Sequence, residues 1–504
     1  MSGDSSLRKE FGDYQTPLDF AYEVCAILKD RGISPSLIFE PTCGIGNFIK
    51  AGLDTFDTVS KAFAVDINPE YCDFCKSNYG NDNVEIFCDN YFSFDVSRFI
   101  DNKREMLVLG NPPWATNSEL NYNLPEKVNF KKLSGTDAIT GASNFDICEY
   151  IILKLIEEFK GTNTTIAMLC KTSVARNVYV EVCKNQYSAE YIAMMNFNAS
   201  KVFGISASAC LLILKLTPYD NNCGNCVVSN IEGKEISSHI KYDNGVLTSI
   251  NDSVCDLSGV CQHEWRQGVK HDCSSVMELK MISPNTFENK RKEIVVLEEN
   301  YVFPLMKSSS FKKAIIDCGF NKYVIVTQKK AREETSSISE NAPKTWEYLM
   351  QNKELFDSRK SSIYNGAPSF SMFGVGDYSY SKYKVGISGF YKKPLFSLLY
   401  NKENPEKPIM LDDTSYFLSF DNYDVAYVCM LLLNSEKVQE FLYSISFKDA
   451  KRPYTKKVLQ RLDFDKCIQN ITIGELQETE KRLLLSEYIT EEMYEKAKTR
   501  LLLN

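Results

Sequence analysis

The stretch SLIFEPTCGIGNFIKAGL, residues 36–53, joins a short apolar run, a loop with two glycines and a segment of helical periodicity. It predicts a strand, a glycine loop and a helix. Similar units follow: KAFAVDIN leads into a helix from Pro69, and VEIFCDNYF, MLVLG, TTIAMLC, YIAMMNF and ACLLILKL are further apolar runs. This alternation predicts an α/β fold with a doubly wound, mostly parallel sheet.

The character of the sequence changes near Tyr219. Beyond it the predicted strands are short, and residues 370–393, FSMFGVGDYSYSKYKVGISGFYKK, interleave aromatic and basic residues with glycine. The last residues, from 474 on, have the pattern of one long helical tail. For a chain of 504 residues we therefore expect two domains, 1–218 and an α+β domain over 219–504.

Composition limits the class of protein. The chain is 44% hydrophobic, but no run approaches the ~18 apolar residues of a membrane span, and its first residues are too polar for a signal peptide. Seventeen cysteines without regular spacing favour reduced thiols and a cytoplasmic protein. The pairs Cys72/Cys75 and Cys223/Cys226 lie too far apart for a compact zinc ribbon, so we expect free thiols and no metal.

Polar residues follow the ends of successive predicted strands, where open α/β sheets bind ligands. Glu40 follows the first strand, and Gly44 and Gly46 would let its loop approach a ligand closely. Asp66 ends the second strand, about twenty residues after the first glycine, where an acid can hold ribose hydroxyls. GIGNF lacks the third glycine of a dinucleotide fingerprint, so by itself this loop is weak evidence and is compatible with a simple turn.

The third strand ends at Asp89 and Asn90, whose oxygens can accept hydrogen bonds from an adenine amino group. An adenine site beside a ribose site, without a second nucleotide fingerprint, favours S-adenosylmethionine as the cofactor. Its amino-acid end would then face Glu40 and the loop that follows.

The fourth predicted strand, MLVLG, ends in NPPW, residues 111–114. The Asn111 side-chain oxygen and the Pro112 carbonyl can accept both hydrogens of an aromatic amine and localise the nitrogen lone pair. Pro112 and Pro113 fix that geometry, because each locks its own φ and restricts its predecessor. Trp114 offers a flat face for a base, which must leave a duplex to reach such a pocket.

With these motifs in order, residues 1–218 resemble the group-gamma N6-adenine DNA methyltransferases of Type II restriction–modification systems, the TaqI-like type. DYQTP, FEPTCGIGNF, AVDIN, CDNYF, NPPW and VFGISASACLLIL match the family motifs in sequence order. The resemblance implies a Rossmann-like fold that binds S-adenosylmethionine. It implies that Thr16 closes the methionine end of the pocket, that Ile67 lies against the cofactor adenine, and that Phe203 stacks on the flipped base.

Residues 219–504 resemble, more diffusely, the target-recognition regions of this family. Phosphate contacts need basic side chains and base contacts need positioned polar groups. With a net charge of −8, a local basic face is expected rather than a basic surface overall. The candidates for DNA contact are Lys307, Lys393, Lys451 and Arg452. We expect a monomer that acts on double-stranded DNA and protects it from a cognate restriction endonuclease without a stable complex.

Other functions remain open at this stage. Motifs of the NPPY type also occur in methyltransferases that act on RNA adenine or protein glutamine. A methylase–nuclease fusion is suggested by HDCSSVMELK, where Asp272 precedes Glu278-x-Lys280, although the run has the pattern of one helix. A catalytically inactive DNA-binding module is disfavoured by the intact NPPW motif.

Overall fold

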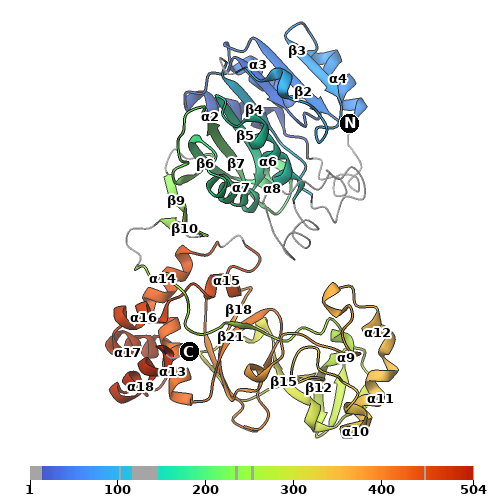
Figure 1. Ribbon diagram of the computed structural model, residues 1–504, viewed down its shortest axis with the longest axis vertical. Helices are drawn as coiled ribbons and strands as arrows, with labels where there is room; N and C mark the ends of the chain where they lie inside the picture. Colours follow the sequence, from blue (N-terminus) through green and yellow to red (C-terminus); the bar gives the residue numbers. More distant parts are fainter. Residues whose placement is uncertain are drawn as a thin grey trace. The chain divides into compact units, whose positions relative to one another are not determined.

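The computed structural model describes residues 14–101, 104–115, 146–232, 236–243, 245–250, 255–447 and 450–502. Two compact units divide the chain, residues 1–251 and residues 252–504 (Figure 1).

In the described part of the first unit, ten strands form one sheet in the order β10-β9-β8-β6-β7-β5-β4-β1-β2-β3. The strands are β1 (Leu37–Glu40), β2 (Lys61–Asp66), β3 (Val84–Cys88), β4 (Met106–Gly110), β5 (Thr164–Lys171), β6 (Ala189–Asn198), β7 (Ser208–Leu216), β8 (Cys226–Asn230), β9 (Ile236–Asp243) and β10 (Val246–Ile250). The first five pair in parallel, and β7 is inserted antiparallel between β5 and β6. The predicted doubly wound, mostly parallel sheet is confirmed.

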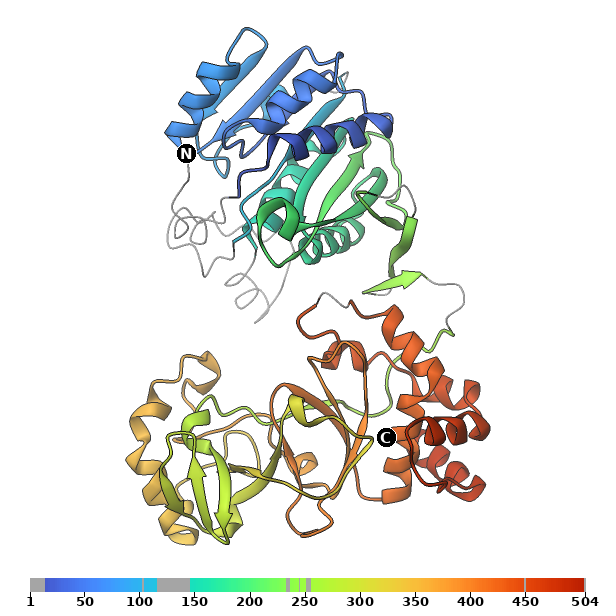
Figure 2. The same cartoon turned by 180° about the vertical axis from the view of Figure 1, so that it is seen from behind.

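Helices cover both faces of this sheet, which explains why every residue of β1 and β4 is buried. The helices are α2 (Leu18–Asp30), α3 (Asn47–Thr55), α4 (Pro69–Tyr79), α6 (Ile147–Phe159), α7 (Thr172–Lys184) and α8 (Ala199–Phe203). α6 and α7 lie in front of the sheet in Figure 1, whereas α2 and α3 are in front when it is seen from behind in Figure 2. Local chemistry sets the starts of α4 and α6, since Asn68 and Asp146 cap them by accepting backbone N–H bonds.

The first unit extends beyond the boundary expected at residue 218. Strand β8 pairs in parallel with β6, from Ala193↔Val227 to Asn196↔Asn230, and β9 and β10 add to the same sheet. The change of composition near Tyr219 therefore marks a turn within the sheet, with Tyr219 itself 76% exposed, and the unit ends after β10.

The second unit contains two smaller sheets. Its five-stranded sheet comprises β11 (Arg266–Gln267), β21 (Ser415–Phe420), β18 (Tyr383–Ser388), β19 (Ser397–Leu399) and β16 (Ile315–Ile316), in that order. Its six-stranded sheet comprises β14 (Ile294–Val296), β13 (Thr286–Asn289), β12 (Glu278–Ser283), β17 (Lys322–Ile325), β15 (Val302–Met306) and β20 (Met410–Leu411). This arrangement is the expected α+β half.

Helices enclose the second unit's sheets. The helices are α9 (Ser274–Met277), α10 (Ile338–Asn341), α11 (Pro343–Gln351), α12 (Lys353–Asp357), α13 (Tyr423–Asn434), α14 (Glu436–Ser444), α15 (Lys456–Leu459), α16 (Phe464–Asn470), α17 (Ile473–Arg482) and α18 (Glu491–Leu502). Helix α13 packs on the five-stranded sheet and is the centre of a large apolar core. Short 3-10 turns, η1 to η5, complete the described elements.

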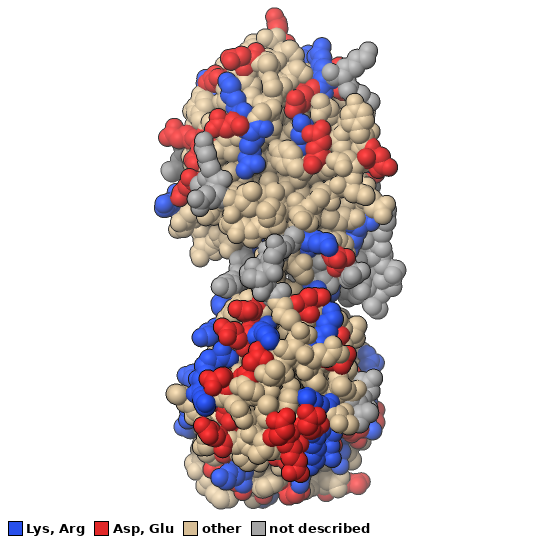
Figure 3. Space-filling model, turned by 90° about the vertical axis from the view of Figure 1, so that its left-hand side faces the viewer, with Lys and Arg blue, Asp and Glu red and all other residues tan. Residues whose placement is uncertain are grey.

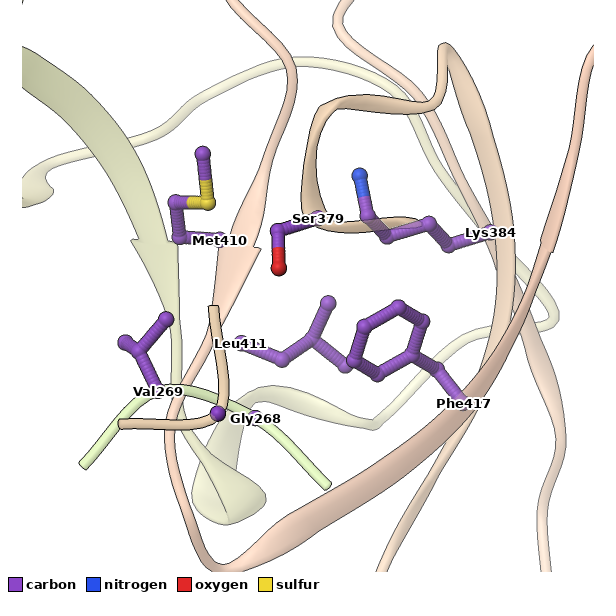
Figure 4. Close-up of a pocket in the computed structure, with 8 residues that line it drawn as sticks. Gly268, Val269, Ser379, Lys384, Met410, Leu411 and Phe417 are labelled. Carbon is purple, nitrogen blue, oxygen red and sulfur yellow. The ribbon is translucent and has the colours of Figure 1, made fainter. Parts of the chain in front are cut away.

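A close backbone crossing joins the two sheets of the second unit. A Cβ at Gly268 would lie 2.2 Å from the Asp412 carbonyl oxygen, and one at Gly374 would lie 2.3 Å from the Gly268 carbonyl oxygen. Figure 4 shows Leu411 and Phe417 beside Gly268, with the aliphatic part of Lys384 running along the Phe417 ring. Burial lowers the pKa of the Lys384 ammonium to about 7, and this group donates to the Ser381 carbonyl at 2.8 Å. The segments WRQGVKH and FGVGDYS therefore meet at glycines because no side chain fits between them.

Two helical expectations in this half are wrong. The C-terminal tail is divided into α17 and α18, since Leu484 adopts a positive φ of 58° and a Glu480 carboxylate oxygen accepts backbone N–H bonds from Tyr488 and Ile489. The run HDCSSVMELK is not one helix, because α9 ends at Met277 and Glu278 begins strand β12.

Among the described residues, no helix is both long enough and apolar enough to cross a membrane.

Candidate active site

The centre of the first unit's sheet is the point where its strand order reverses. β1 and β4 are parallel neighbours there, and the chain crosses to β2 on one side and to β5 on the other. Ligands of doubly wound sheets bind outside the carboxyl ends of strands at such a point. Glu40 ends β1, and Asn111 directly follows β4 at the same edge. The structure therefore brings together two of the residues that the sequence placed at strand ends.

The loop after β1 is shaped by its glycines and by Asp66. Gly44 and Gly46 have φ values of +51° and +76°, which L side chains rarely adopt. One carboxylate oxygen of Asp66 accepts the Gly44 N–H at 2.7 Å, and the other accepts the Asn68 N–H at 2.8 Å. Asp66 thus holds the glycine loop against the end of β2.

Three buried polar oxygens near this loop have no hydrogen-bond partner within the described part of the chain. They belong to Glu40 (Oε2), Thr16 (Oγ1) and Thr42 (Oγ1). Burial raises the pKa of the Glu40 carboxyl well above its usual range, and the nearby Cys75 and Asp66 add to that shift. Buried polar groups are normally paired, so this group of oxygens has the character of a ligand site.

Asp89, Asn90 and Ile67 follow the neighbouring strands. Asp89 is exposed beyond β3, and its N–H donates to the Asp66 carbonyl at 3.0 Å. The Asn90 side-chain oxygen accepts the Phe92 N–H at 3.0 Å, which gives that oxygen a structural role in the turn. Ile67 is 55% exposed although it is apolar, so it presents an apolar surface beside Asp66.

Asn111 has a fixed side-chain orientation. Its Nδ2 donates to the Tyr14 carbonyl at 2.7 Å, whereas its Oδ1 is buried and has no partner among the described residues. The amide nitrogen is therefore occupied and the oxygen remains available as an acceptor. This is the orientation that polarisation of an amine requires.

The residues after Pro113 are anchored from two sides. The Trp114 indole N–H donates to the Leu169 carbonyl at 3.3 Å, and the Ile147 N–H donates to the Ala115 carbonyl at 2.9 Å. Trp114 is only 6% exposed. The segment is thus tied to β5 and to the start of α6, and its prolines further restrict the backbone.

Trp114 and Phe203, which the family resemblance implies for opposite faces of a base, contact each other directly in the structure. Their ring centroids are 5.5 Å apart at an interplanar angle of 74°. The Tyr14 ring lies 6.4 Å from Trp114 and 6.2 Å from Phe203. A base stacked between two parallel rings needs them roughly 7 Å apart, twice the ~3.4 Å stacking distance. The ring pair is therefore closed, and a base would have to separate it.

Sequence reasoning missed three residues of this site: Tyr14, Gln15 and Thr42. Gln15 Oε1 accepts the Ile45 N–H at 3.1 Å, and a Cβ on Gly44 would lie 2.3 Å from that oxygen. Gln15 adjoins Thr16, and Thr42 lies within the glycine-loop motif, so position alone could have singled them out. No sequence signal identifies the Tyr14 carbonyl, because any residue has one.

In the second unit, the structure brings two of the predicted basic clusters together. The Lys392 ammonium donates to the Ala450 carbonyl at 2.5 Å, and the Tyr454 hydroxyl donates to the Lys392 carbonyl at 3.1 Å. The Arg452 guanidinium lies 5.0 Å from the centre of the Phe390 ring and donates to the Asp413 carbonyl at 3.3 Å. Lys393 and Lys451, both exposed, belong to the same pair of loops. We call the loops 389–394 and 450–455 the basic ridge.

On the C-terminal helices of this unit, basic side chains pair with acidic ones. Lys481 pairs with Glu478 at 3.1 Å, and Lys498 pairs with Glu495 at 2.6 Å. Figure 3 shows a face of the second unit on which basic and acidic side chains alternate. Such mixed surfaces attract polyanions weakly, so the basic ridge is the better candidate for phosphate contact.

Lys307, the fourth predicted DNA contact, is engaged internally. Its ammonium lies 2.7 Å from a Glu278 oxygen, and Lys290 lies 2.8 Å from the other. Burial alone would raise the pKa of Glu278, but hydrogen bonds from Lys290 and Lys307 outweigh it and hold that pKa below its usual value. Sequence could not show this pairing, since 29 residues separate Lys307 from Glu278.

The two predicted cysteine pairs lie in different settings. Cys72 and Cys75 are buried on α4, and their thiols donate at 3.3 Å to the carbonyls of Asp66 and Gly44, respectively. Cys223 is half-buried and Cys226 begins β8. Within the described ranges, no group of three or more His, Cys, Asp or Glu side chains is placed to hold a metal ion.

A central sheet in the order β3-β2-β1-β4-β5-β7-β6, with a glycine loop after β1 and NPPW after β4, defines an α/β methyltransferase fold. No protein-family profile matches the chain. The Type II methyltransferase M.NspV of Nostoc sp. is 40% identical over 468 residues, which cover 90% of this chain and 96% of the relative. The chain belongs to the Type II methyltransferases.

Two further comparisons are more distant. The Type II methyltransferase M.CvrRI of Paramecium bursaria Chlorella virus XZ-6E is 25% identical over 172 residues, or 34% of this chain and 39% of the relative. The structure of the Type IIL restriction-modification enzyme MmeI in complex with DNA has a TM-score of 0.56 at 12% identity. That likeness covers 99% of this chain and 76% of the other and concerns the fold.

Proposed function

We propose that this Type II methyltransferase transfers a methyl group from S-adenosylmethionine to N6 of an adenine at a specific site in double-stranded DNA. The observation that carries the proposal is the Asn111 carboxamide. Its nitrogen is held by the Tyr14 carbonyl, and its oxygen is buried and free among the described residues at the sheet's switch point. An amine placed there would donate one hydrogen to Asn111 and the other to the Pro112 carbonyl.

The residues around the glycine loop fit the cofactor. S-adenosylmethionine supplies a sulfonium methyl, which is the electrophile of the reaction. Glu40 Oε2 and the hydroxyls of Thr16 and Thr42 are buried and without partners in the described chain, and they suit the charged amino-acid end. Asp66 would hold the ribose hydroxyls and Asp89 the adenine amine, while exposed Ile67 would pack on the adenine ring.

The closed ring pair of Trp114 and Phe203 fits a pocket that a flipped base opens. Trp114 is anchored through its indole N–H, whereas Phe203 ends the five-residue helix α8 and is only half-buried. Phe203 is therefore the ring that would move. An extrahelical adenine would then stack on Trp114 with its amine toward Asn111, and it must leave its duplex to do so.

The basic ridge of the second unit would contact the DNA backbone. Lys393 and Lys451 are exposed, and Arg452 is fixed by Phe390 and the Asp413 carbonyl. Residues 252–504 would then select the sequence, and residues 1–251 would perform the transfer. We infer that the enzyme protects DNA from a cognate restriction endonuclease as a separate monomer.

The deciding experiment incubates the enzyme with methyl-labelled S-adenosylmethionine and, in parallel, with plasmid DNA, total RNA and soluble protein. Sequencing that detects modified bases then reads the plasmid. We expect label in DNA alone, as N6-methyladenine in one sequence context. Label in RNA or protein but not DNA, or N4-methylcytosine in the plasmid, would refute the proposal. Magnesium-dependent cleavage of the plasmid would instead support a methylase–nuclease fusion.

A further inference from the structure

Residues Tyr14–Thr16, the N-terminal strap, contact both the glycine loop and the segment after β4. At one end the Tyr14 carbonyl accepts the Asn111 Nδ2–H at 2.7 Å. At the other end Asn47 Nδ2 donates to the Thr16 carbonyl at 2.7 Å, and the Ile45 N–H donates to Gln15 Oε1 at 3.1 Å. Ile45 and Asn47 belong to the glycine loop and to the first turn of α3. The three residues of the strap thus connect the glycine loop to Asn111.

The strap fits the loop closely. A Cβ added to Gly44 would lie 2.3 Å from Gln15 Oε1, so the side chain of Gln15 covers that glycine directly. After Thr16, Pro17 restricts the backbone and occupies the position before Leu18, where helix α2 begins. The strap is therefore fixed at its C-terminal end by helix α2, and it is also fixed by its hydrogen bonds to the glycine loop. A displacement of the loop would carry the Tyr14 carbonyl with it.

The orientation of Asn111 depends on that carbonyl. An amide side chain can present either its oxygen or its nitrogen to a substrate, and the fixed partner of one end decides which is presented. Here the Tyr14 carbonyl takes the nitrogen, and Oδ1 is left as the buried acceptor. Without this bond the carboxamide could rotate and offer N–H groups to an amine that needs an acceptor.

We propose that the N-terminal strap is a positioning element that couples the cofactor loop to the orientation of the Asn111 carboxamide. Asn47 is then a positioning residue, because it acts on Asn111 only through Thr16 and Tyr14. This inference rests on the proposed adenine chemistry for its kinetic consequence, but the coupling itself is a property of the chain. An ordered cofactor loop fixes the strap, and the fixed strap holds the acceptor toward the base.

The test compares Asn47→Ala and Asn47→Asp with wild type. Asn47→Asp keeps the shape but replaces the donor with an oxygen that faces the Thr16 carbonyl. The matched control is Asn78→Ala, which removes another Asn Nδ2 bond to a carbonyl, that of Phe74 at 2.8 Å, on the exposed side of α4. Each protein is assayed for S-adenosylhomocysteine affinity and for single-turnover methyl transfer at saturating cofactor and DNA.

Both Asn47 variants should lose about tenfold or more of the single-turnover rate, because small misplacements of a reacting group are costly. Their affinity for S-adenosylhomocysteine should change by less than about threefold, and Asn78→Ala should match wild type in both assays. A role confined to supporting the cofactor loop predicts the reverse: weaker affinity with an unchanged rate at saturation. That result would overturn the inference.

Amide hydrogen exchange tests the coupling between the cofactor loop and the Asn111 segment in the absence of any DNA substrate. In wild type, S-adenosylhomocysteine should slow exchange in peptides that cover residues 39–50 and residues 106–115. In Asn47→Ala it should slow exchange in the first peptide only. Equal protection of both peptides in the variant would overturn the inference, even if the enzyme methylates a base other than adenine. Failure of wild type to produce N6-methyladenine would count against the proposed function alone.

Discussion

Gly46 offers a quantitative test of the site's packing. It caps helix α3 with φ +76° and ψ 23°, a left-handed conformation. A Cβ at this position would lie 2.9 Å from both the Cys75 Sγ and the Tyr79 Cε2. Gly161 has a similar φ of +73°, yet nothing lies within 4 Å of its Cβ position. The two glycines therefore share one backbone requirement and differ only in the space around them.

The change to alanine should have two separable costs. In a left-handed conformation alanine costs about 1–2 kcal/mol, offset by about 0.4–1 kcal/mol from the stiffer unfolded chain. Overpacking adds about 1–3 kcal/mol, and only Gly46→Ala incurs it. Gly161→Ala should thus lose about 1 kcal/mol and Gly46→Ala about 2 kcal/mol more. For a unit of this size that difference corresponds to roughly 4–8 °C in Tm.

Differential scanning fluorimetry of both variants measures this difference, and calorimetric titration with S-adenosylhomocysteine shows whether the loop has shifted. A double-mutant cycle with Cys75→Ala should return part of the loss, because the sulfur is one of the two atoms in the way. The recovery of stability should be incomplete, because the Tyr79 ring also lies 2.9 Å from the Cβ position. Equal melting temperatures for Gly46→Ala and Gly161→Ala would refute the close approach of α4 to the loop.

Three further outcomes are expected. Asn111→Ala should lower the rate of methyl transfer by roughly 10²–10³-fold with little change in cofactor affinity, as loss of one transition-state hydrogen bond does. A rate within tenfold of wild type, measured by rapid quench, would contradict the proposed role of Asn111. Burial raises the pKa of the Glu40 carboxyl well above its usual range, and a cationic ligand beside the carboxylate would lower that pKa again. Affinity for S-adenosylmethionine should therefore rise as pH rises through that raised pKa, with proton release in calorimetry that Glu40→Gln abolishes. Replacement of Lys451 or Arg452 by alanine should each reduce the slope of log affinity for DNA against log salt by about 0.9, whereas Lys498→Ala should not.

Sequence predicted the centre of this fold well, because the determinants there are local. Glu40 and Asp66 end β1 and β2, Asn111 directly follows β4, and parallel strands bring their carboxyl ends to one edge. Glu40 and Asn111 therefore lie at the ends of neighbouring strands although about seventy positions separate them in the sequence. Phe203 was placed near Trp114 by family resemblance, and the rings do lie together, although in contact rather than apart.

The remaining features could not be predicted, because they depend on backbone atoms or on distant partners. The bond from Asn111 to the Tyr14 carbonyl spans 97 residues and involves no particular side chain at position 14. The engagement of Lys307 by Glu278 requires β12 and the end of β15 to lie near each other. Local patterns also missed the break after α17, where a buried Glu480 carboxylate receives N–H bonds from a turn.

The pairing of β8 with β6 has a practical consequence for the isolation of the first unit as a fragment. A fragment that stops at residue 218 would lose β8 to β10 and leave Ala193–Asn196 as an open strand edge. This edge carries Met194 and Met195, which are buried in the full chain. Unpaired apolar edges recruit other chains, so such a fragment would aggregate for reasons unrelated to catalysis. A fragment that ends after β10 keeps the edge covered.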